Sequence, residues 1–487
     1  MSARKAGGVL AVTCISALVV NANTSAVAIL LPAISTDTGM AVSTLQWAVT
    51  GYSLVGAAVI VTAGALGDIF GRRIVFLAGL LLFVASCVLI ALSPGGGGVI
   101  AGRCIQGAAG STILACGMSL LTVAYGDKHE RLRAVSLWGA ASAVGAAAGP
   151  LVGGVLVDTT GWQGLFWIDA AIAAACIPLT MAAVAESRDP GRSRSIDIAG
   201  TVLVALVLAP LIFALTEGSA WGWASAKTVG CLLVSAIACV AFVLVERRVR
   251  SPLLDLALLR NRALVAATLA ILIGSGAING IMYAVSLYFQ SPDALGMSAM
   301  QAGLATLPVT AAAVALAPCI APLAAKFGIR PTVLFGFLIM TASFTALAFV
   351  TADWRYGAFV LPLVGVAVGM SLENGPASSV STSAVSEDEV GAASGVSNMA
   401  RYVGAAVMTA IVASVYTQTG TDRLAAGDAA NDALAAGLSH AAIAMAVMSA
   451  AGIGLTALAA GKAPKTRPIH LAQAAASTSH TLPVQQT

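Results

Sequence analysis

Charged residues are scarce in this chain of 487 residues, because Lys, Arg, Asp and Glu make up only 9% of it while 59% is hydrophobic. Soluble proteins carry about 25% charged residues, so the composition argues against a soluble fold. The mean hydropathy of +0.93 points the same way. No interval of the sequence has the polar surface that a soluble domain needs. The composition therefore predicts an integral membrane protein whose solvent is the lipid bilayer.

Motifs for nucleotide, metal and nucleic-acid chemistry are also missing. The sequence has no Gly-x4-Gly-Lys-Ser/Thr loop, which argues against ATP-driven transport. Its four histidines, at 129, 440, 470 and 480, are scattered and indicate neither a metal site nor a catalytic triad, which argues against a membrane enzyme or sensor. The net charge of +4 comes without a basic cluster that aromatic residues interrupt. We therefore expect no cofactor, no metal, no enzyme activity and no nucleic-acid partner.

The cysteines are few and lie inside apolar segments, without the close pairing that zinc sites show. We interpret them as small packing residues. They are Cys14, Cys87, Cys104, Cys116, Cys176, Cys231, Cys239 and Cys319.

Apolar segments of about 20 residues, the length that crosses a bilayer as a helix, occur fourteen times. The first is interpreted as a membrane helix and not as a secretory signal, because its apolar run extends to about Ile34. The predicted fold class is therefore all-α, with fourteen transmembrane helices. The approximate spans are 9–34, 45–66, 74–93, 98–124, 134–157, 164–184, 197–216, 227–245, 263–290, 300–323, 331–350, 356–375, 394–416 and 439–461.

The basic residues indicate how these helices are oriented. If both termini are cytoplasmic, 20 of the 25 Lys and Arg residues fall on the cytoplasmic side. Lys227, Arg355 and Arg423 fall outside, and Arg103 and Arg401 lie within helices. Because cytoplasmic loops of membrane proteins are enriched in Lys and Arg, the sequence predicts a multi-pass protein of the cytoplasmic membrane with both termini inside.

An internal repeat suggests how the helices are grouped. The segment Leu66–Arg73 is echoed by Leu323–Arg330, with Leu, Phe, Gly and the final Arg in register. Both segments follow the second helix of a six-helix unit, as in transporters that are built from parallel repeats. We predict six-helix bundles at 1–185 and 251–462, a linker with two inserted helices at 186–250, and a disordered tail at 463–487. A chance likeness between two glycine-rich loops is the alternative.

The segment 64–73 is a charged connection between two apolar spans. Glycines at 64, 67 and 71 accept positive φ at little steric cost, so we expect a tight loop at the membrane face. Asp68 is expected to pair with Arg72 or Arg73, or to cap a neighbouring helix N-terminus. Ordinary solvation of a polar turn is the alternative.

Three motifs stand at defined places in the predicted helices. They are the loop Gly64-x-Leu66-Gly67-Asp68-x-Phe70-Gly71-Arg72-Arg73, the fourth-helix Arg103-x-x-Gln106-Gly107, and the fifth-helix Gly145-x-x-x-Gly149-Pro150-x-x-Gly153-Gly154. They resemble signatures of the major facilitator superfamily, the fifth-helix motif being typical of its exporting branches. With its fourteen helices the chain resembles the 14-helix drug:proton antiporter family, and further residues add to this likeness: Gly161-Trp162, Phe166-Trp167, Ser394-Gly395 and Arg401.

The resemblance implies an exporter of drugs or antibiotics that works by alternating access in exchange for protons. Arg103 would tune a nearby proton-carrying acid, although snorkelling to the membrane face is the alternative. A conformational latch would comprise Gly64, Asp68, Gly71, Arg72 and Arg73. The antiporter helix, a plug against leakage, would comprise Gly145, Gly149, Pro150, Gly153 and Gly154, for which plain close packing is the alternative.

The sequence departs from the family where an acid is usual in the first helix, about nine residues before a proline. That position holds Asn23, which cannot take up and release protons at neutral pH. Glu373 is the first candidate for a proton carrier instead, unless it pairs permanently with Arg401 or lies at the cytoplasmic mouth. Asp169 is the second candidate, or a cap of helix six. A facilitator or exporter of another metabolite without proton coupling is the alternative function.

Polar and aromatic side chains are candidates for binding substrate. The residues are Asn21, Asn23, Thr24, Ser25, Trp47, Tyr52 and Gln106, with Tyr283, Tyr288 and Phe289 as further aromatic candidates. Hydrogen bonding between helices is the alternative for the polar stripe of the first helix, and ordinary packing for the aromatic rings. Few acids and the presence of Arg103 favour a small amphipathic substrate that is neutral or anionic. We expect the protein to act as a monomer.

Overall fold

The computed structural model describes residues 3–125, 127–188, 197–249, 252–254, 256–385 and 390–458. The predicted tail at 463–487 lies outside these residues. Every regular element in the described part is helical, and the prediction of an all-α membrane protein is confirmed. The elements are α1 (Ala3–Thr38), α2 (Val42–Leu45), α3 (Trp47–Phe70), α4 (Arg72–Ala91), α5 (Gly96–Ala124), α6 (Lys128–Thr160), α7 (Gln163–Ala183), α8 (Ile198–Trp221), α9 (Ala226–Glu246), η1 (Leu258–Arg260), α10 (Arg262–Gln290), α11 (Ala299–Ala305), α12 (Leu307–Phe327), α13 (Ile329–Leu347), α14 (Tyr356–Ser383), α15 (Val390–Ala425) and α16 (Ala430–Leu458).

Within the described residues, fourteen segments are long and apolar enough to cross a membrane, as predicted. One of them combines α2 with α3, and another combines α11 with the greater part of α12. Their mean hydropathy lies between 1.4 and 2.9. Because the number of spans is even, the first and the last described helix have their outer ends on the same face.

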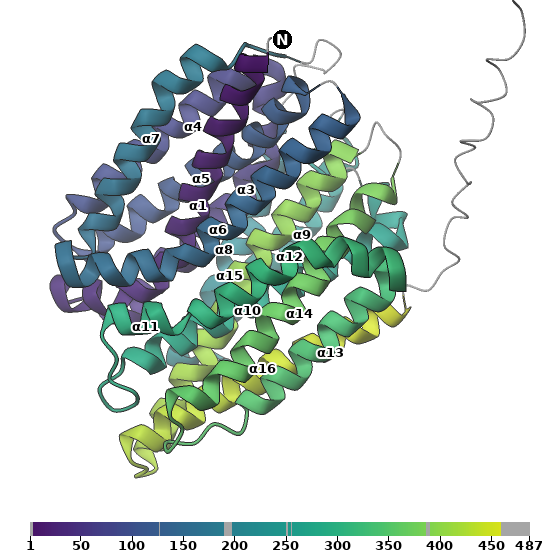
Figure 1. Cartoon of the computed structure of the whole chain (residues 1–487). Helices are drawn as coiled ribbons and strands as arrows, with labels where there is room; N and C mark the ends of the chain where they lie inside the picture. Colours follow the sequence, from purple (N-terminus) through teal and green to yellow (C-terminus); the bar gives the residue numbers. More distant parts are fainter. Residues whose placement is uncertain are drawn as a thin grey trace, which may run out of the picture.

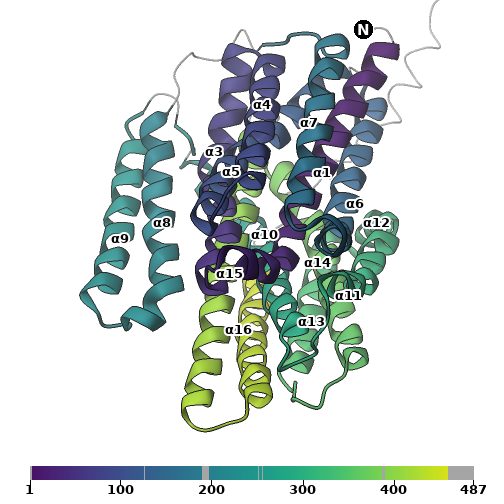
Figure 2. The same ribbon diagram turned by 90° about the vertical axis from the view of Figure 1, so that its left-hand side faces the viewer.

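The buried apolar side chains form two large clusters. One is built mainly by α1, α3–α5 and α7, and the other mainly by α10–α16 (Figure 1). We call these groups of helices, with α6 in the first, the N-bundle and the C-bundle. Figure 2 shows α8 and α9 as a pair at one side of the molecule. Helix α8 of this pair packs against α3 and α15, and a smaller apolar cluster joins both bundles to α8 and α9.

The two bundles touch along α3 and α15 and again where α6 meets α11. At the second contact, Ser298 Oγ donates to Asp158 Oδ2 at 3.1 Å. Nearby, Ser286 Oγ of α10 donates to the carbonyl oxygen of Ala28 in α1 at 3.0 Å. These bonds lie in the half of the molecule that is distant from the start of α1. The described polar contacts between α1 or α6 and the C-bundle are therefore gathered toward one face.

The connection between the last two helices is shorter than predicted. The sequence suggested a long loop between spans ending at 416 and beginning at 439, but α15 continues to Ala425 and α16 begins at Ala430. The segment is polar yet rich in alanine, the best helix former, so the helices extend past the apolar stretch. Arg423 and Asp428 form an ion pair of 3.4 Å at the turn.

Candidate functional site

A buried arginine lies at the centre of the N-bundle. Arg103 of α5 has 0% of its surface exposed. Its Nε donates to the carbonyl oxygen of Ala48 at 2.9 Å, and its Nη1 donates to Asn23 Oδ1 and Gln106 Oε1 at 2.5 Å each. Its guanidinium lies 4.3 Å from the centroid of the Tyr52 ring, a cation–π contact. The guanidinium is held inside the bundle, so the snorkelling alternative for Arg103 is wrong.

An acid from α7 completes this site. Asn23 Nδ2 donates to Asp169 Oδ2 at 2.7 Å, and the Asp169 side chain is buried. The alternative role of Asp169 as a helix cap is wrong, because Asp169 is the seventh residue of α7 and Trp162 occupies the N-cap. The first-helix position at which an acid was missing is therefore in direct contact with an acid from another helix.

Cys87 of α4 also belongs to this site. Gln106 Nε2 donates to Cys87 Sγ at 2.9 Å, and both side chains are buried. For Cys87 the interpretation as a packing residue was therefore incomplete. The Arg103 cluster is defined here as Asn23, Tyr52, Cys87, Arg103, Gln106 and Asp169.

Within the described residues, two buried polar atoms of the Arg103 cluster have no hydrogen-bond partner, Arg103 Nη2 and Tyr52 Oη. A buried donor without an acceptor is unfavourable, and such groups often mark a site where a ligand or a water molecule binds. Arg103 Nη2 is the point of the cluster at which an oxygen of a bound molecule would fit.

The second intramembrane arginine is Arg401 of α15, in the C-bundle. Its Nε and Nη2 donate to Asn374 Oδ1 at 3.1 and 2.9 Å. Its Nη1 donates to Asn398 Oδ1 at 2.7 Å, and its Nη2 also donates to Ser378 Oγ at 2.6 Å. All of these acceptors are neutral, so the charge of Arg401 has no direct counter-ion among them.

Glu373 of α14 lies next to this network but outside it. Its side chain is 0% exposed, and neither carboxyl oxygen has a hydrogen-bond partner within the described residues. A Cβ at Gly274 of α10 would overlap Glu373 Oε2, which shows how closely the acid is packed. The alternative of a permanent ion pair between Glu373 and Arg401 is therefore wrong, and a place at the cytoplasmic mouth stays an alternative. A carboxyl group buried without a partner fits this environment only as the neutral acid.

The polar stripe of the first helix is divided by the structure. Asn23 hydrogen-bonds to side chains of two other helices, whereas each of the other three side chains bonds to a carbonyl group of α1 itself. Ser and Thr commonly bond in this way to the carbonyl four residues earlier. The bonds run from Asn21 Nδ2 to Ala17 O (2.7 Å), from Thr24 Oγ1 to Val20 O (2.7 Å) and from Ser25 Oγ to Asn21 O (3.1 Å).

The aromatic candidates are not gathered around one site. The Trp47 ring packs against Phe213 of α8, with centroids 4.2 Å apart, and its Nε1 lies 3.5 Å from Glu217 Oε1. Tyr52 lies between Arg103 and Tyr402 of α15, whose ring centroid is 6.3 Å away. Three others are buried in packed cores, as the packing alternative predicted: Tyr283, Tyr288 and Phe289.

The glycine stripe of α6 packs directly on α1. A Cβ at Gly145 would overlap the carbonyl oxygen of Leu18, and one at Gly149 would overlap that of Ala22. At Gly153 a Cβ would lie 3.1 Å from the Cβ of Ala26, tighter than an ordinary contact. The stripe thus lets the α6 backbone lie against the helix segment that carries Asn23.

The opposite side of α6 faces the C-bundle. A Cβ at Gly154 would overlap the carbonyl oxygen of Ala299 in α11. In return, a Cβ at Gly303 of α11 would lie 2.5 Å from the carbonyl oxygen of Pro150. Hence α6 packs closely on one side against α1 and on the other against α11, so it connects the Arg103 cluster's first helix to the other bundle.

The charged connection is shorter than the loop that the sequence suggested. Helix α3 continues through Gly64, Gly67 and Asp68 to Phe70, and only Gly71, with φ of 123°, separates it from α4. The first two glycines are helical because a helix interior tolerates glycine at a cost of about 1 kcal/mol. Asp68 Oδ1 accepts from Arg72 Nε and Nη2 at 2.9 Å each, the pairing that was predicted.

A carboxylate that sequence reasoning missed caps this connection. Glu186, which follows α7, accepts at its two carboxyl oxygens from the backbone N–H groups of Arg73 and Ile74, at 3.2 Å each. The backbone N–H of Arg72 donates to the carbonyl oxygen of Ser187 at 3.0 Å. A negative charge at a helix N-terminus is stabilising. The only signal in the sequence was an acid directly after the sixth span.

The repeated segment at 323–330 has the same local structure as its counterpart. Gly328, with φ of 92°, separates α12 from α13 as Gly71 separates α3 from α4. The last arginine of each copy bonds near the end of its bundle's last helix: Arg73 Nη2 to the Met181 carbonyl at 3.0 Å in α7, and Arg330 Nη2 to the Ala457 carbonyl at 2.5 Å in α16. This shared pattern of hydrogen bonds argues against a chance resemblance between the two segments.

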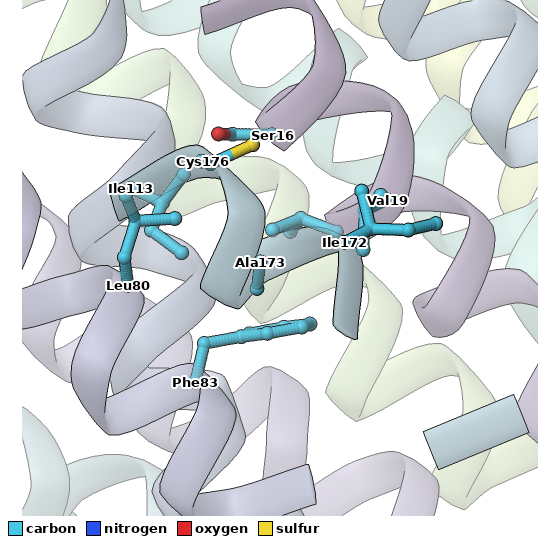
Figure 3. A pocket seen from close by; sticks show the side chains of 9 residues that line it. Ser16, Val19, Leu80, Phe83, Ile113, Ile172, Ala173 and Cys176 are labelled. Carbon is cyan, nitrogen blue, oxygen red and sulfur yellow. The ribbon is translucent and has the colours of Figure 1, made fainter. Parts of the chain in front are cut away.

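A small cavity lies elsewhere in the N-bundle, between α1, α4, α5 and α7 (Figure 3). Its volume of about 10 Å³ admits roughly one water molecule, whereas pockets for drug-sized ligands measure about 300–1,000 Å³. Apart from Ser16 and Cys176, the side chains around it are apolar. It is a packing void and not a substrate site.

Comparisons with known proteins agree with this architecture. The structure resembles that of the human organic anion transporter MFSD10 (TETRAN), with a TM-score of 0.61 and 16% identity, covering 93% of this chain and 99% of the other. It resembles an auto-inhibited POT-family peptide transporter with a TM-score of 0.68 and 15% identity, covering 96% and 99%. At these identities the likeness concerns the fold.

Relatives in sequence are named for resistance and export. The chain is 30% identical over 402 residues to the multidrug resistance protein Stp of Mycobacterium tuberculosis (strain CDC 1551 / Oshkosh), covering 82% of this chain and 73% of that protein. It is 29% identical to the tetracenomycin C resistance and export protein of Streptomyces glaucescens (82% and 73% covered). It is 30% identical to the cephamycin export protein CmcT of Amycolatopsis lactamdurans (85% and 85%). The Major Facilitator Superfamily model matches residues 13–409, and the chain is a member of that superfamily.

Proposed function

We propose that this transporter exports small amphipathic drugs or antibiotics across the cytoplasmic membrane by alternating access, in exchange for protons. Both termini would be cytoplasmic, as the distribution of Lys and Arg favours. The names of the relatives support export of antibiotics as the activity. Without a nucleotide-binding loop in the sequence, the energy would come from an ion gradient.

The observation that carries the proposal is the Arg103 cluster, which lies within helices long enough to cross the membrane. Ionisable groups inside a membrane are costly and are usually functional. Arg103 and Asp169 are both buried there and are joined through one amide. Such a site offers a proton-binding carboxyl group and a cation that responds to it, which are the two parts that proton exchange needs.

The substrate would bind beside this cluster, at the boundary between the bundles. Arg103 Nη2 has no partner among the described residues, and Tyr52 connects the cluster to Tyr402 of the C-bundle. An unpaired guanidinium donor and an aromatic face suit an amphipathic molecule with an oxygen acceptor, neutral or anionic. Gln106 would assist at the cluster, whereas Asn21, Thr24, Ser25 and Trp47 would shape its surroundings.

Opening and closing would involve the two ends of the bundle contact. At one end the α6 stripe, with Pro150 and Gly154, packs on α11. At the other, the connection from Gly64 to Arg73 holds the Asp68–Arg72 pair. We infer that the first contact acts as the plug against leakage and the second as the latch of the state that faces the opposite side.

Transport in proteoliposomes tests the proposal directly. The purified protein is reconstituted, loaded with a labelled antibiotic of the kinds that the relatives' names mention, and exposed to an imposed pH gradient of either sign. We expect uphill movement of the antibiotic, reversal when the gradient is reversed, and simultaneous proton movement. Transport that follows only the substrate's own gradient would favour the alternative, a facilitator or exporter of a metabolite without proton coupling.

A further inference from the structure

We propose that Asp169 is the proton-binding group of the N-bundle, and that Asn23 transmits its charge state to Arg103. The inference rests on the proposed proton exchange, and it names the acid that replaces the one missing from the first helix. It is carried by the two hydrogen bonds of a single amide, from Asn23 Nδ2 to Asp169 Oδ2 and from Arg103 Nη1 to Asn23 Oδ1.

The chemistry of the three groups fixes the direction of this bridge. A guanidinium has only donors, so Asn23 must turn its carbonyl oxygen toward Arg103. Its NH₂ group must then face Asp169, where it needs an acceptor. The amide is therefore polarised by a positive charge on one side and by a carboxyl group on the other. Asn23 cannot rotate its amide without losing both bonds.

The charge on Asp169 decides whether Arg103 is compensated. With Asp169 ionised, Arg103 and Asp169 form an ion pair that is bridged by the amide of Asn23. When one proton binds to the carboxylate, the negative charge is lost and Arg103 becomes a buried cation without a counter-ion, which is strongly unfavourable. Two events can relieve this: the bundles move so that Arg103 meets water, or Arg103 Nη2 binds an anionic or polar group of a substrate.

The helices around Asp169 present few other groups that would compete for this role. Arg103 of α5 acts on the carboxyl group of Asp169 electrostatically, and the Cys87 thiol of α4 lies near it. The arginine at the start of α4, Arg73, bonds at the other end of α7. One acid of α1 and one of α6 bond elsewhere: Asp37 with Trp162 Nε1, and Asp158 with Ser298.

The first variants to compare exchange the two side chains. Asp169→Asn removes the acid with almost no change in shape. The double variant Asn23→Asp, Asp169→Asn returns an acid to the same bridge from the other side. Asn21→Asp combined with Asp169→Asn is the matched control, because Asn21 bonds to its own helix at Ala17 and not to Arg103. Substrate counterflow, which requires no gradient, checks that each variant is folded and binds substrate.

Two measurements are made on each variant. One is antibiotic transport driven by a pH gradient in proteoliposomes. The other is infrared difference spectroscopy of the purified protein during a pH change, which detects protonation of a carboxyl group without any transport. We expect Asp169→Asn to lose gradient-driven transport and one carboxyl band but to keep counterflow. The double exchange should regain both signals, and the Asn21→Asp control should regain neither.

The outcomes separate this inference from the proposed function. If the wild-type protein uses the pH gradient and Asp169→Asn does so equally well, the inference is wrong and the proposed function stands. If no variant is driven by the gradient but the carboxyl band disappears with Asp169 and returns in the double exchange, the inference stands and the proposed function is wrong. An unchanged carboxyl band in Asp169→Asn overturns the inference in either case.

Discussion

Replacing Gly71 with alanine is expected to destabilise the protein by about 1.5–5 kcal/mol, for two reasons that the structure separates. First, φ at Gly71 is 123°, and a residue with a side chain is strained there by about 1–3 kcal/mol. Second, the new Cβ would lie 2.6 Å from Cδ and Oε1 of Glu186. The carboxylate would have to move and give up its bonds to the N-terminus of α4, a capping loss of about 0.5–2 kcal/mol.

Two other glycines serve as matched controls. Gly328 occupies the equivalent position in the second copy with φ of 92°, but its nearest neighbour would be Pro331 Cδ at 3.4 Å, an ordinary contact. Gly328→Ala should therefore show the strain alone, about 1–3 kcal/mol. Gly64 is helical, and a Cβ there would meet nothing within 4 Å. Gly64→Ala should stabilise the protein by about 0.5–1 kcal/mol.

The assay is reversible unfolding of the purified protein in mixed detergent micelles, followed by tryptophan fluorescence. From the most to the least stable, the expected order is Gly64→Ala, wild type, Gly328→Ala and Gly71→Ala. Removing the carboxylate with Glu186→Ala should reduce the extra effect of Gly71→Ala, because the two residues are in contact. If Gly71→Ala and Gly328→Ala unfold at the same detergent composition, Glu186 contributes nothing at this position and the reasoning is refuted.

Three further substitutions test the transport roles. Asp68→Asn should leave the protein inserted in the membrane but lower export. Its free energy of unfolding should change by less than about 1 kcal/mol, because the pair with Arg72 is partly exposed. Normal export at equal membrane abundance would show that Asp68 is not part of a latch. Gly149→Leu should abolish transport, because its side chain would overlap the backbone of Ala22. Gly139→Leu should be tolerated in the same helix, because a Cβ at that position meets nothing within 4 Å. Glu373→Gln should keep the fold, since a neutral group fits this buried position, but it should lose uphill export. Retained uphill export would show that Glu373 carries no proton.

Much of the fold follows from the sequence alone. Long apolar segments predict the fourteen spans because a membrane helix must satisfy its backbone hydrogen bonds internally. The pairing of Asp68 with Arg72 was also predictable, since residues four apart meet on one face of a helix. The prediction of a turn at Gly64 and Gly67 was wrong, because glycine permits a turn without requiring one and packing decides.

The contacts that define the site could not be predicted from the sequence in the same way. Asn23 and Asp169 are 146 residues apart, and Glu186 lies 113 residues from Arg73. Neither pair has a local periodicity that would relate its members. Such contacts depend on how helices are arranged in the bundle, and the sequence of one chain specifies that arrangement only through the whole of its packing. The sequence therefore identified the ionisable residues but not their partners.

Asn23 illustrates why an expected residue type can be absent while its chemistry remains. The requirement in the N-bundle is electrostatic: a guanidinium that is fully buried needs a negative charge or polar acceptors close to it. Both α1 and α7 face Arg103, so a carboxyl group on either helix can meet that need at a similar cost of burial. With the acid on α7, the residue on α1 must both accept from Arg103 and donate to Asp169, and an amide is a side chain that does both. An asparagine at position 23 is thus what the packing requires once the acid lies at position 169. The C-bundle lacks this bridge, because Asn374 accepts from Arg401 while Glu373 has no hydrogen bond within the described residues. Asp169 and Glu373 therefore differ in how they relate to the buried arginine of their bundle: among the described contacts, Asp169 is bridged to Arg103 by an amide, whereas Glu373 has no such bridge to Arg401.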